Sequence, residues 1–456
     1  MTAALERFAP ALLAATVVVV ALGSSSVDAL ASLGRSGRWP ALFLLAAVAT
    51  LLAVRRGSLL DAAREPLYIA AAGFVGLAAL SVAWTVDPAL TAQRAISVVS
   101  LVAAAAGLGW AARGRPHVAG RLLLGLLAGA AAVAAAGLVV LALSFDDAVQ
   151  AAPFRYRGLG ENPNTVSMLA AIATPLALWA AMTAERGRRR TFGLASFVLF
   201  YGTIVFSGSR GALLAAFGGS LVVVLGTAPT MSRRLRHAGV AAALFVLAVG
   251  LSQLPQLSAP PTVVAIGPGT TGGETTPEKP LPSVPPSLPQ SEVSIGSMAD
   301  ETDRPATTTN SRRTLFASSG RVLAWRAAID QGNNRPLLGY GFGTEDAVFV
   351  DRIYTFQSGR PENSFVGVYL QLGLAGVALL AAIVLAALRG GTRAIRSLAT
   401  RPEALRLALA VTGVGLAGAL MALVQSYVYS AGNIASLTVW TSLFLVAGAA
   451  SWSEPE

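Results

Sequence analysis

Long apolar segments recur along the whole chain, and each is close to the length that a helix needs to cross a bilayer, about 20 residues. We predict twelve membrane-spanning helices, of which the second and the seventh are short. The predicted spans are 9–29, 39–54, 66–84, 95–112, 119–143, 164–183, 191–207, 211–228, 238–254, 363–388, 404–426 and 433–452. The pattern therefore predicts an all-α polytopic membrane protein with about 12 transmembrane helices.

The basic residues gather in every second connection between these spans. The connections on the side of the amino terminus hold 19 arginines, whereas the short connections on the opposite side hold six. Because positively charged short connections stay on the cytoplasmic side, we predict a multi-pass protein of the bacterial cytoplasmic (inner) membrane with both termini in the cytoplasm. The first span resembles a secretory signal, but the many spans after it favour an uncleaved helix.

One connection is far longer than the others, and it divides the chain into three parts. Residues 1–254 hold nine predicted spans, residues 255–362 form a large extracytoplasmic loop, and residues 363–456 hold the last three spans. Within the loop, residues 255–312 are rich in Pro, Thr, Ser and Gly, a composition typical of disorder. Residues 313–362 are expected to be ordered and partly helical, because apolar residues recur there at helical spacing.

The overall composition excludes several classes of protein. Charged residues make up 12% of the 456 residues, and the mean hydropathy is +0.63. That charged share is about half of what is usual in soluble domains. With no cysteine and two histidines, we expect no metal site and no cofactor. The net charge of +11 divides into +12 in the cytoplasm and −1 outside, so it reports topology and no nucleic-acid partner is needed.

Two arginines that could carry chemistry lie at the outer ends of predicted helices. Arg210 occupies a very tight turn, where its guanidinium could bind a lipid phosphate or diphosphate, or reach the membrane interface as a snorkelling side chain. Arg321 and Trp325 share one face of the helix expected in the long loop, and Trp325 is predicted to bind substrate. That face could point toward the membrane, or the helix could be amphipathic and solvated.

Further polar residues stand directly before two of the spans. Glu362 could act as a general base on an acceptor hydroxyl, with the adjacent Asn363 binding substrate. Alternatively, Asn363 or Ser364 could cap the tenth span without any catalytic role. The residues before the sixth span could contact phosphate or sugar, and a helix start would also explain them. They are Arg155, Arg157, Asn162 and Asn164. The glycine pattern of residues 413–418 lies inside an apolar span, where it favours close helix packing over nucleotide binding.

Several short motifs, taken in order, resemble the O-antigen ligase and polymerase superfamily. They are Trp84–Pro88, Gly160–Asn164, Ser207–Gly211, Ser319–Arg321 with Trp325, Arg335–Gly341, Glu362–Phe365 and Leu370–Gly376. The resemblance covers roughly residues 80–390. The order of the motifs, the number of spans and the long outer loop together make the set specific.

The resemblance implies a membrane glycosyltransferase of the multi-helix type. Its donor would be an oligosaccharide on a polyprenyl diphosphate in the lipid bilayer, and its acceptor a glycan or glycolipid at the outer membrane face. Arg210 and Arg321 would stabilise the leaving diphosphate without a metal, and Glu362 would deprotonate the acceptor for inverting displacement. The ligases carry His-Asn where this chain has Glu362–Asn363, so both single transfer and polymerisation stay open.

Two other classes share parts of the pattern. A transporter that flips lipid-linked glycans would use ionisable groups near the middle of the membrane, and the predicted spans have none there. A peptidoglycan-type glycan polymerase would use the same kind of donor, but its outer-loop motifs differ from those of this chain.

Overall fold

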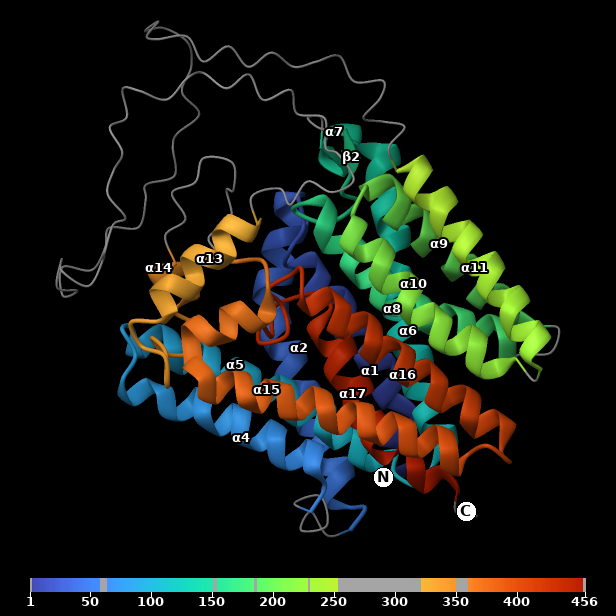
Figure 1. Ribbon diagram of the computed structural model, residues 1–456, viewed down its shortest axis with the longest axis horizontal. Helices are drawn as coiled ribbons and strands as arrows, with labels where there is room; N and C mark the ends of the chain where they lie inside the picture. The colour runs from blue at the N-terminus through green and yellow to red at the C-terminus, as the bar shows by residue number, and fades with distance from the viewer. Residues whose placement is uncertain are drawn as a thin grey trace, which may run out of the picture.

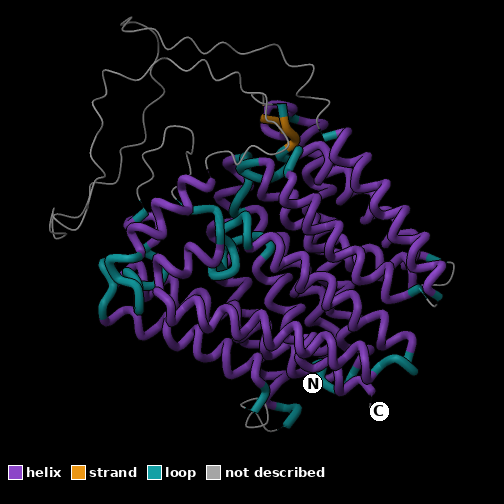
Figure 2. The backbone as a smooth tube through the Cα atoms, viewed as in Figure 1, coloured by secondary structure: helices purple, strands orange, loops and turns teal. Residues whose placement is uncertain are grey.

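The computed structural model describes residues 2–57, 64–150, 154–183, 187–228, 230–252, 321–349 and 360–453. These residues form a bundle of helices, with one short strand pair at the edge (Figures 1 and 2). Within the described residues, eleven helices are long and apolar enough to cross a membrane. The predicted fold class is therefore confirmed. The predicted disordered stretch, residues 255–312, lies outside the described residues.

The helices before the long loop follow the predicted order. They are α1 (Thr2–Leu22), α2 (Asp28–Val54), α4 (Pro66–Leu80), α5 (Pro88–Ala111), α6 (Pro116–Leu143), α8 (Pro163–Thr183), α9 (Arg188–Ser207), α10 (Arg210–Thr227) and α11 (Met231–Leu251). A 3-10 turn, η1 (Ser81–Ala83), extends α4. Between α6 and α8 lie α7 (Phe145–Ala148), β1 (Val149–Gln150) and β2 (Arg155–Tyr156), the two strands being antiparallel. Proline opens α4, α5, α6 and α8, a position where its missing N–H costs nothing.

The second part of the chain adds the helices of the outer loop and the last spans. They are α13 (Arg321–Gly332), α14 (Glu345–Val348), α15 (Ser364–Ser397), α16 (Pro402–Ala422), α17 (Ser436–Gly448) and the 3-10 helix η2 (Ala449–Ser453). Gly373 has φ 62° and interrupts α15 with non-helical backbone. The last predicted span is shorter as a helix than expected, because α17 has 13 residues and continues into η2.

The two ends of the bundle contain the connections that the alternation of spans predicts. Both termini lie at the same end (Figure 1). There Glu6 forms ion pairs with Arg56 and Arg115, and the Trp452 indole N–H donates to the carbonyl of Ala112 at 3.1 Å. These residues all belong to segments predicted on the side of the amino terminus. That this end faces the cytoplasm stays a prediction from the arginine distribution.

Small residues let the spanning helices approach closely, as the glycine pattern of residues 413–418 predicts. A Cβ added at Gly413 would lie 2.6 Å from the carbonyl oxygen of Gly219, and a Cβ at Gly219 would lie 2.6 Å from the carbonyl oxygen of Gly413. The backbones of α10 and α16 therefore touch at this crossing. This contact holds α16 against α10.

Candidate active site

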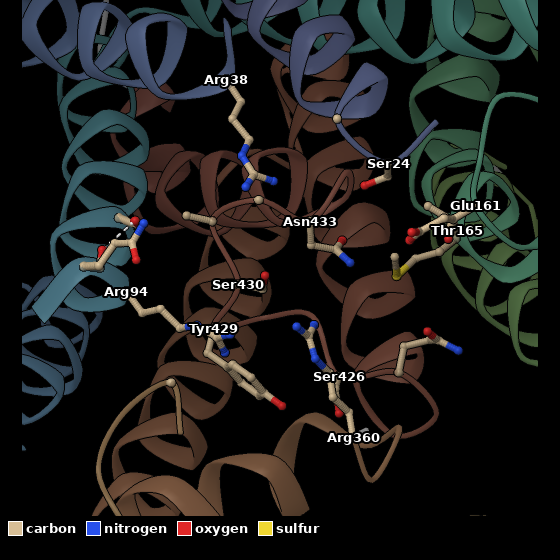
Figure 3. Close-up of a pocket in the computed structure, with 18 of the residues that line it drawn as sticks. Ser24, Arg38, Arg94, Glu161, Thr165, Arg360, Ser426, Tyr429, Ser430 and Asn433 are labelled. Carbon is tan, nitrogen blue, oxygen red and sulfur yellow. Dashed lines mark hydrogen bonds between the residues drawn. The ribbon is translucent and has the colours of Figure 1, made fainter. Parts of the chain in front are cut away.

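A polar cavity of about 470 Å³ lies at the end of the bundle opposite the termini (Figure 3). Its wall comes from α2, α5, the start of α8, the connection of residues 23–24, and two further pairs of segments, residues 342–343 with 360–362 and residues 425–426 with 429–433. The charged side chains that line it are Arg38, Arg94, Glu161, Arg360 and Glu362. Of the residues predicted from the sequence to form a site, Glu362 and Asn162 line this cavity. Most of the cavity wall therefore comes from residues that the motifs did not identify.

Glu362 stands at a sharp corner where the chain turns into α15. With φ 52°, it is the one non-glycine residue of the described chain with a left-handed backbone. The side chain of Asn363 caps α15, accepting from the N–H groups of Phe365 at 2.9 Å and Val366 at 3.2 Å. The predicted cap is thus confirmed, and it fixes the residue directly after Glu362. Strained backbone of this kind is concentrated at functional sites.

Arg210 lies at the first position of α10, after a turn that two residues brace. Gly208, with φ 61°, ends α9, and only a glycine takes up that conformation without strain. Arg155 is buried and donates from Nε to the carbonyl of Ser207 at 2.6 Å, and from Nη2 to Oδ1 of Asn164 at 2.9 Å. In this arrangement Arg155 and Asn164, predicted to bind substrate, support the turn that carries Arg210.

The other two residues predicted before the sixth span are placed differently. Arg157 donates to the backbone carbonyls of Asp146 and Asp147, both at 2.8 Å, and so ties down the short helix α7. Asn162 accepts from the N–H of Asn164 at 3.0 Å and caps α8 while it lines the cavity. Asn162 is thus the member of this group that faces the space where a substrate would lie.

Arg321 and Trp325 belong to α13, which packs against α15. Arg210 lies within the electrostatic range of Arg321. Two guanidinium groups within electrostatic range of each other suit a ligand with two anionic groups, such as a diphosphate. The Trp325 indole N–H is buried and has no hydrogen-bond partner within the described part of the chain. The helix therefore brings one predicted catalytic arginine next to the other.

The end of α16 connects the Arg210 turn with the Glu362 corner. A Cβ added at Gly211 would lie 2.7 Å from Cγ2 of Val424, so the turn packs directly on Val424. The Nδ2 group of Asn363 donates to the carbonyl of Leu423 at 3.0 Å. Because Leu423 and Val424 are neighbours, the Arg210 turn and the Glu362 corner pack on the same short segment.

Three further motifs of the resemblance pack on one another beside the cavity. The Trp84 indole N–H donates to the carbonyl of Leu338 at 3.1 Å. The N–H groups of Tyr340 and Gly341 donate to carbonyls at the interruption of α15, those of Leu370 at 3.1 Å and Gln371 at 2.9 Å. Motifs far apart in the sequence thus form a single wall, which explains why they occur together.

An ion-pair cluster that sequence reasoning missed closes one side of the cavity. The carboxylate of Asp346 accepts from Arg94 at 2.9 Å and from Arg360 at 2.9 and 3.2 Å. Burial by itself would raise the pKa of Asp346, but the hydrogen bonds from Arg360 and Arg94 outweigh it and hold that pKa below its ordinary value. The one sequence signal was the acidic pair Glu345–Asp346 after a glycine-rich turn.

Arg38 is a second residue that the motifs did not identify. It reaches from α2 toward the connection that carries Asn433 (Figure 3). Its guanidinium lies 4.8 Å from the ring centroid of Trp39, and in the described part of the chain no carboxylate pairs with it. A held, uncompensated guanidinium in a polar cavity is suited to bind an anionic or hydroxyl-rich group.

The bundle and this cavity define a polytopic membrane protein with a cationic polar site at one end of its helices. The family model described as O-antigen ligase matches residues 195–381. The matched region contains Arg210, Arg321, Trp325, Glu362 and Asn363, and it confirms the resemblance to the O-antigen ligase and polymerase superfamily. No curated protein sequence matches the chain significantly. The family indicates a glycosyl-transferring membrane enzyme that acts on lipid-linked oligosaccharides and glycan acceptors.

Proposed function

We propose that the protein transfers or polymerises an oligosaccharide from a polyprenyl diphosphate, such as undecaprenyl diphosphate, onto an acceptor in the cell envelope. Transfer takes place at the outer face of the cytoplasmic membrane, is metal-independent and inverts the sugar carbon. The observation that supports this most is that the Arg210 turn and Asn363, the neighbour of Glu362, pack on the same short segment after α16, beside the polar cavity that Glu362 lines. The family match over the same residues is consistent with it.

The paired arginines suit the leaving group. When the bond between the sugar carbon and the diphosphate oxygen breaks, the diphosphate gains one negative charge. Arg210 and Arg321 lie within electrostatic range of each other, so both positive charges can act on one diphosphate. Stabilisation by two guanidinium groups grows as the bond breaks, and it therefore lowers the barrier without a divalent cation.

The Glu362 corner suits the acceptor. Its carboxylate takes the proton of an acceptor hydroxyl while that oxygen forms the new bond to the sugar carbon from the face opposite the diphosphate. The products are the extended or newly attached glycan and the free polyprenyl diphosphate. The cavity that Glu362 lines has a volume of about 470 Å³, within the range of small-ligand pockets. Its lining of arginine, asparagine and glutamine side chains matches the hydroxyl groups of a sugar.

The test is transfer by the purified protein in detergent, with a defined lipid-linked oligosaccharide and candidate acceptors. We expect Arg210→Ala and Arg321→Ala each to lower the rate about 100-fold or more, and Glu362→Gln to lower kcat more than it changes the donor KM. The matched control is Arg326→Ala, because Arg326 is exposed on the same helix as Arg321. Wild-type rates in both Arg210→Ala and Arg321→Ala would refute the assignment.

Detergent also separates the competing classes. A flippase moves its cargo between two membrane faces, so it forms no new glycan in micelles. A peptidoglycan-type polymerase would accept a peptidoglycan precursor as donor in the same assay. Product length then distinguishes a single transfer from polymerisation.

A further inference from the structure

A carboxyl group that the proposed chemistry does not use is buried behind the cavity wall. Glu345 is the first residue of α14 and is 1% exposed. It accepts hydrogen bonds from the Tyr429 hydroxyl at 2.6 Å, from Nε2 of Gln371 at 3.2 Å and from the Ser426 hydroxyl at 3.3 Å. The three donors come from α15 and from the connection of residues 423–435, so one carboxyl group joins three separate segments.

The neighbouring helix leaves room for this group. A Cβ added at Gly367 would lie 2.1 Å from the Tyr429 hydroxyl and 2.8 Å from Oε1 of Glu345. The amide oxygen of Gln371 accepts from the N–H of Gly343 at 2.7 Å, so Gln371 is held on both sides. The Glu345 and Tyr429 side chains therefore occupy the space that the Cβ of any residue other than glycine would need at position 367.

One hydroxyl group links this cluster to the Glu362 corner. Ser426 donates to Glu345, and its oxygen accepts from the backbone N–H of Asn363 at 3.1 Å. Asn363 directly follows Glu362, whose backbone is held in a left-handed conformation. Ser426 and Tyr429 also line the cavity (Figure 3). A change at Glu345 therefore reaches the cavity wall through Ser426, and Glu362 through Ser426 and Asn363.

We propose that Glu345 is a positioning residue for Glu362. In its uncharged form it donates its proton to the Tyr429 oxygen, accepts from Gln371 and Ser426, and so holds Ser426 and Tyr429 in the arrangement that transfer requires. This inference rests on the proposed function. Loss of the proton places a negative charge in a site that excludes water, and that charge attracts Arg360 away from Asp346 or draws water into the cluster. Either response loosens the wall that carries the Glu362 corner.

The charges around Glu345 support titration near neutral pH. Burial raises its pKa to about 7, against an attraction from Arg360 and hydrogen bonds from Tyr429 and Ser426 that lower it. Asp346, next in the chain, raises it further and is itself paired with Arg360 and with Arg94 of α5. The side of α15 that meets Glu345 contributes the uncharged Gln371 and Gly367. The cluster thus holds its proton below about pH 7.

The kinetic test compares wild type with Glu345→Gln and Glu345→Ala in the transfer assay across pH. We expect Glu345→Ala to lower kcat about tenfold or more with little change in the donor KM. We expect Glu345→Gln to keep most of the wild-type rate at pH 6 and to lack the fall in rate that wild type shows above pH 7. The matched control is Asp330→Asn, an exposed acid on α13, which should behave as wild type.

Infrared difference spectroscopy tests the proton without any substrate. Wild type should show the carbonyl band of a protonated carboxyl group at pH 6, weakening above pH 7, and Glu345→Gln should lack it. If Glu345→Ala does not fold, Ser426→Ala removes the same link and should lower kcat in the same way. An alkaline fall that persists in Glu345→Gln, or a missing band in wild type, would overturn the inference. Absence of product from wild type would instead refute the proposed function.

Discussion

Replacing Gly367 by alanine tests the packing on which the Glu345 cluster depends. In an exposed helix interior this change stabilises by about 0.5–1 kcal/mol, because alanine loses less backbone entropy than glycine. Here the new methyl would lie 2.1 Å from the Tyr429 hydroxyl, so Tyr429 must move and give up its hydrogen bond to Glu345. Overpacking costs about 1–3 kcal/mol, and a lost buried hydrogen bond costs about 1–3 kcal/mol. The expected result is net destabilisation by about 2–4 kcal/mol.

The matched control is Gly76→Ala. Gly76 lies inside α4, and a Cβ added there meets nothing within 4 Å. Both variants are compared with wild type by denaturant or thermal unfolding in the same detergent, and by kcat in the transfer assay. Gly76→Ala should be neutral or slightly stabilising, whereas Gly367→Ala should be less stable and slower. Equal stability of the two variants would refute the packing argument.

Three further outcomes follow from the same contacts. Arg155→Gln removes the hydrogen bonds to Ser207 and Asn164 and should raise the donor KM about tenfold. The comparison in the same kinetic assay is Arg157→Gln, because the native Arg157 contacts α7 and not the Arg210 turn. Arg38→Gln should raise the acceptor KM and leave the donor KM unchanged; a change confined to the donor would contradict the placement of the acceptor. Because the pKa of Glu345 is higher in the folded protein than in the unfolded chain, its protonated form stabilises the fold fully below about pH 4.5, and this stabilisation is lost as the pH rises through about 7. The free energy of unfolding of wild type should therefore fall between these pH values, and that of Glu345→Gln should not.

The sequence predicted the parts of this protein that depend on local patterns. Apolar length identified the spans, and Asn363 was recognisable as a cap from its place before an apolar run. The helix ends in this region were not predicted, because the expected spans 404–426 and 433–452 both extend into residues 423–435, which lie between α16 and α17. In the structure these residues instead leave the helix and bond to the Glu362 corner, as the contact between Ser426 and Asn363 illustrates.

The contacts between distant segments could not be read from the sequence. The guanidinium of Arg155 meets the carbonyl of Ser207, which is 52 residues away, and no local periodicity encodes that pairing. Arg94 on α5 donates a hydrogen bond to Asp346 in the outer loop, which is 252 residues further along the sequence. Nothing in the local sequence marks Glu345 as buried, because the groups that enclose it come from α15 and from residues 423–435.

The central claim is that Arg210 and Arg321 stabilise a departing lipid diphosphate while an acceptor takes the sugar. The most direct measurement follows the release of free polyprenyl diphosphate and the formation of glycan product together, from one purified lipid-linked oligosaccharide in detergent. Wild type should release one diphosphate for each sugar bond formed, and Arg210→Ala and Arg321→Ala should lose both signals in parallel while Arg326→Ala keeps them. Product formation at the wild-type rate in both alanine variants of the paired arginines would contradict the account.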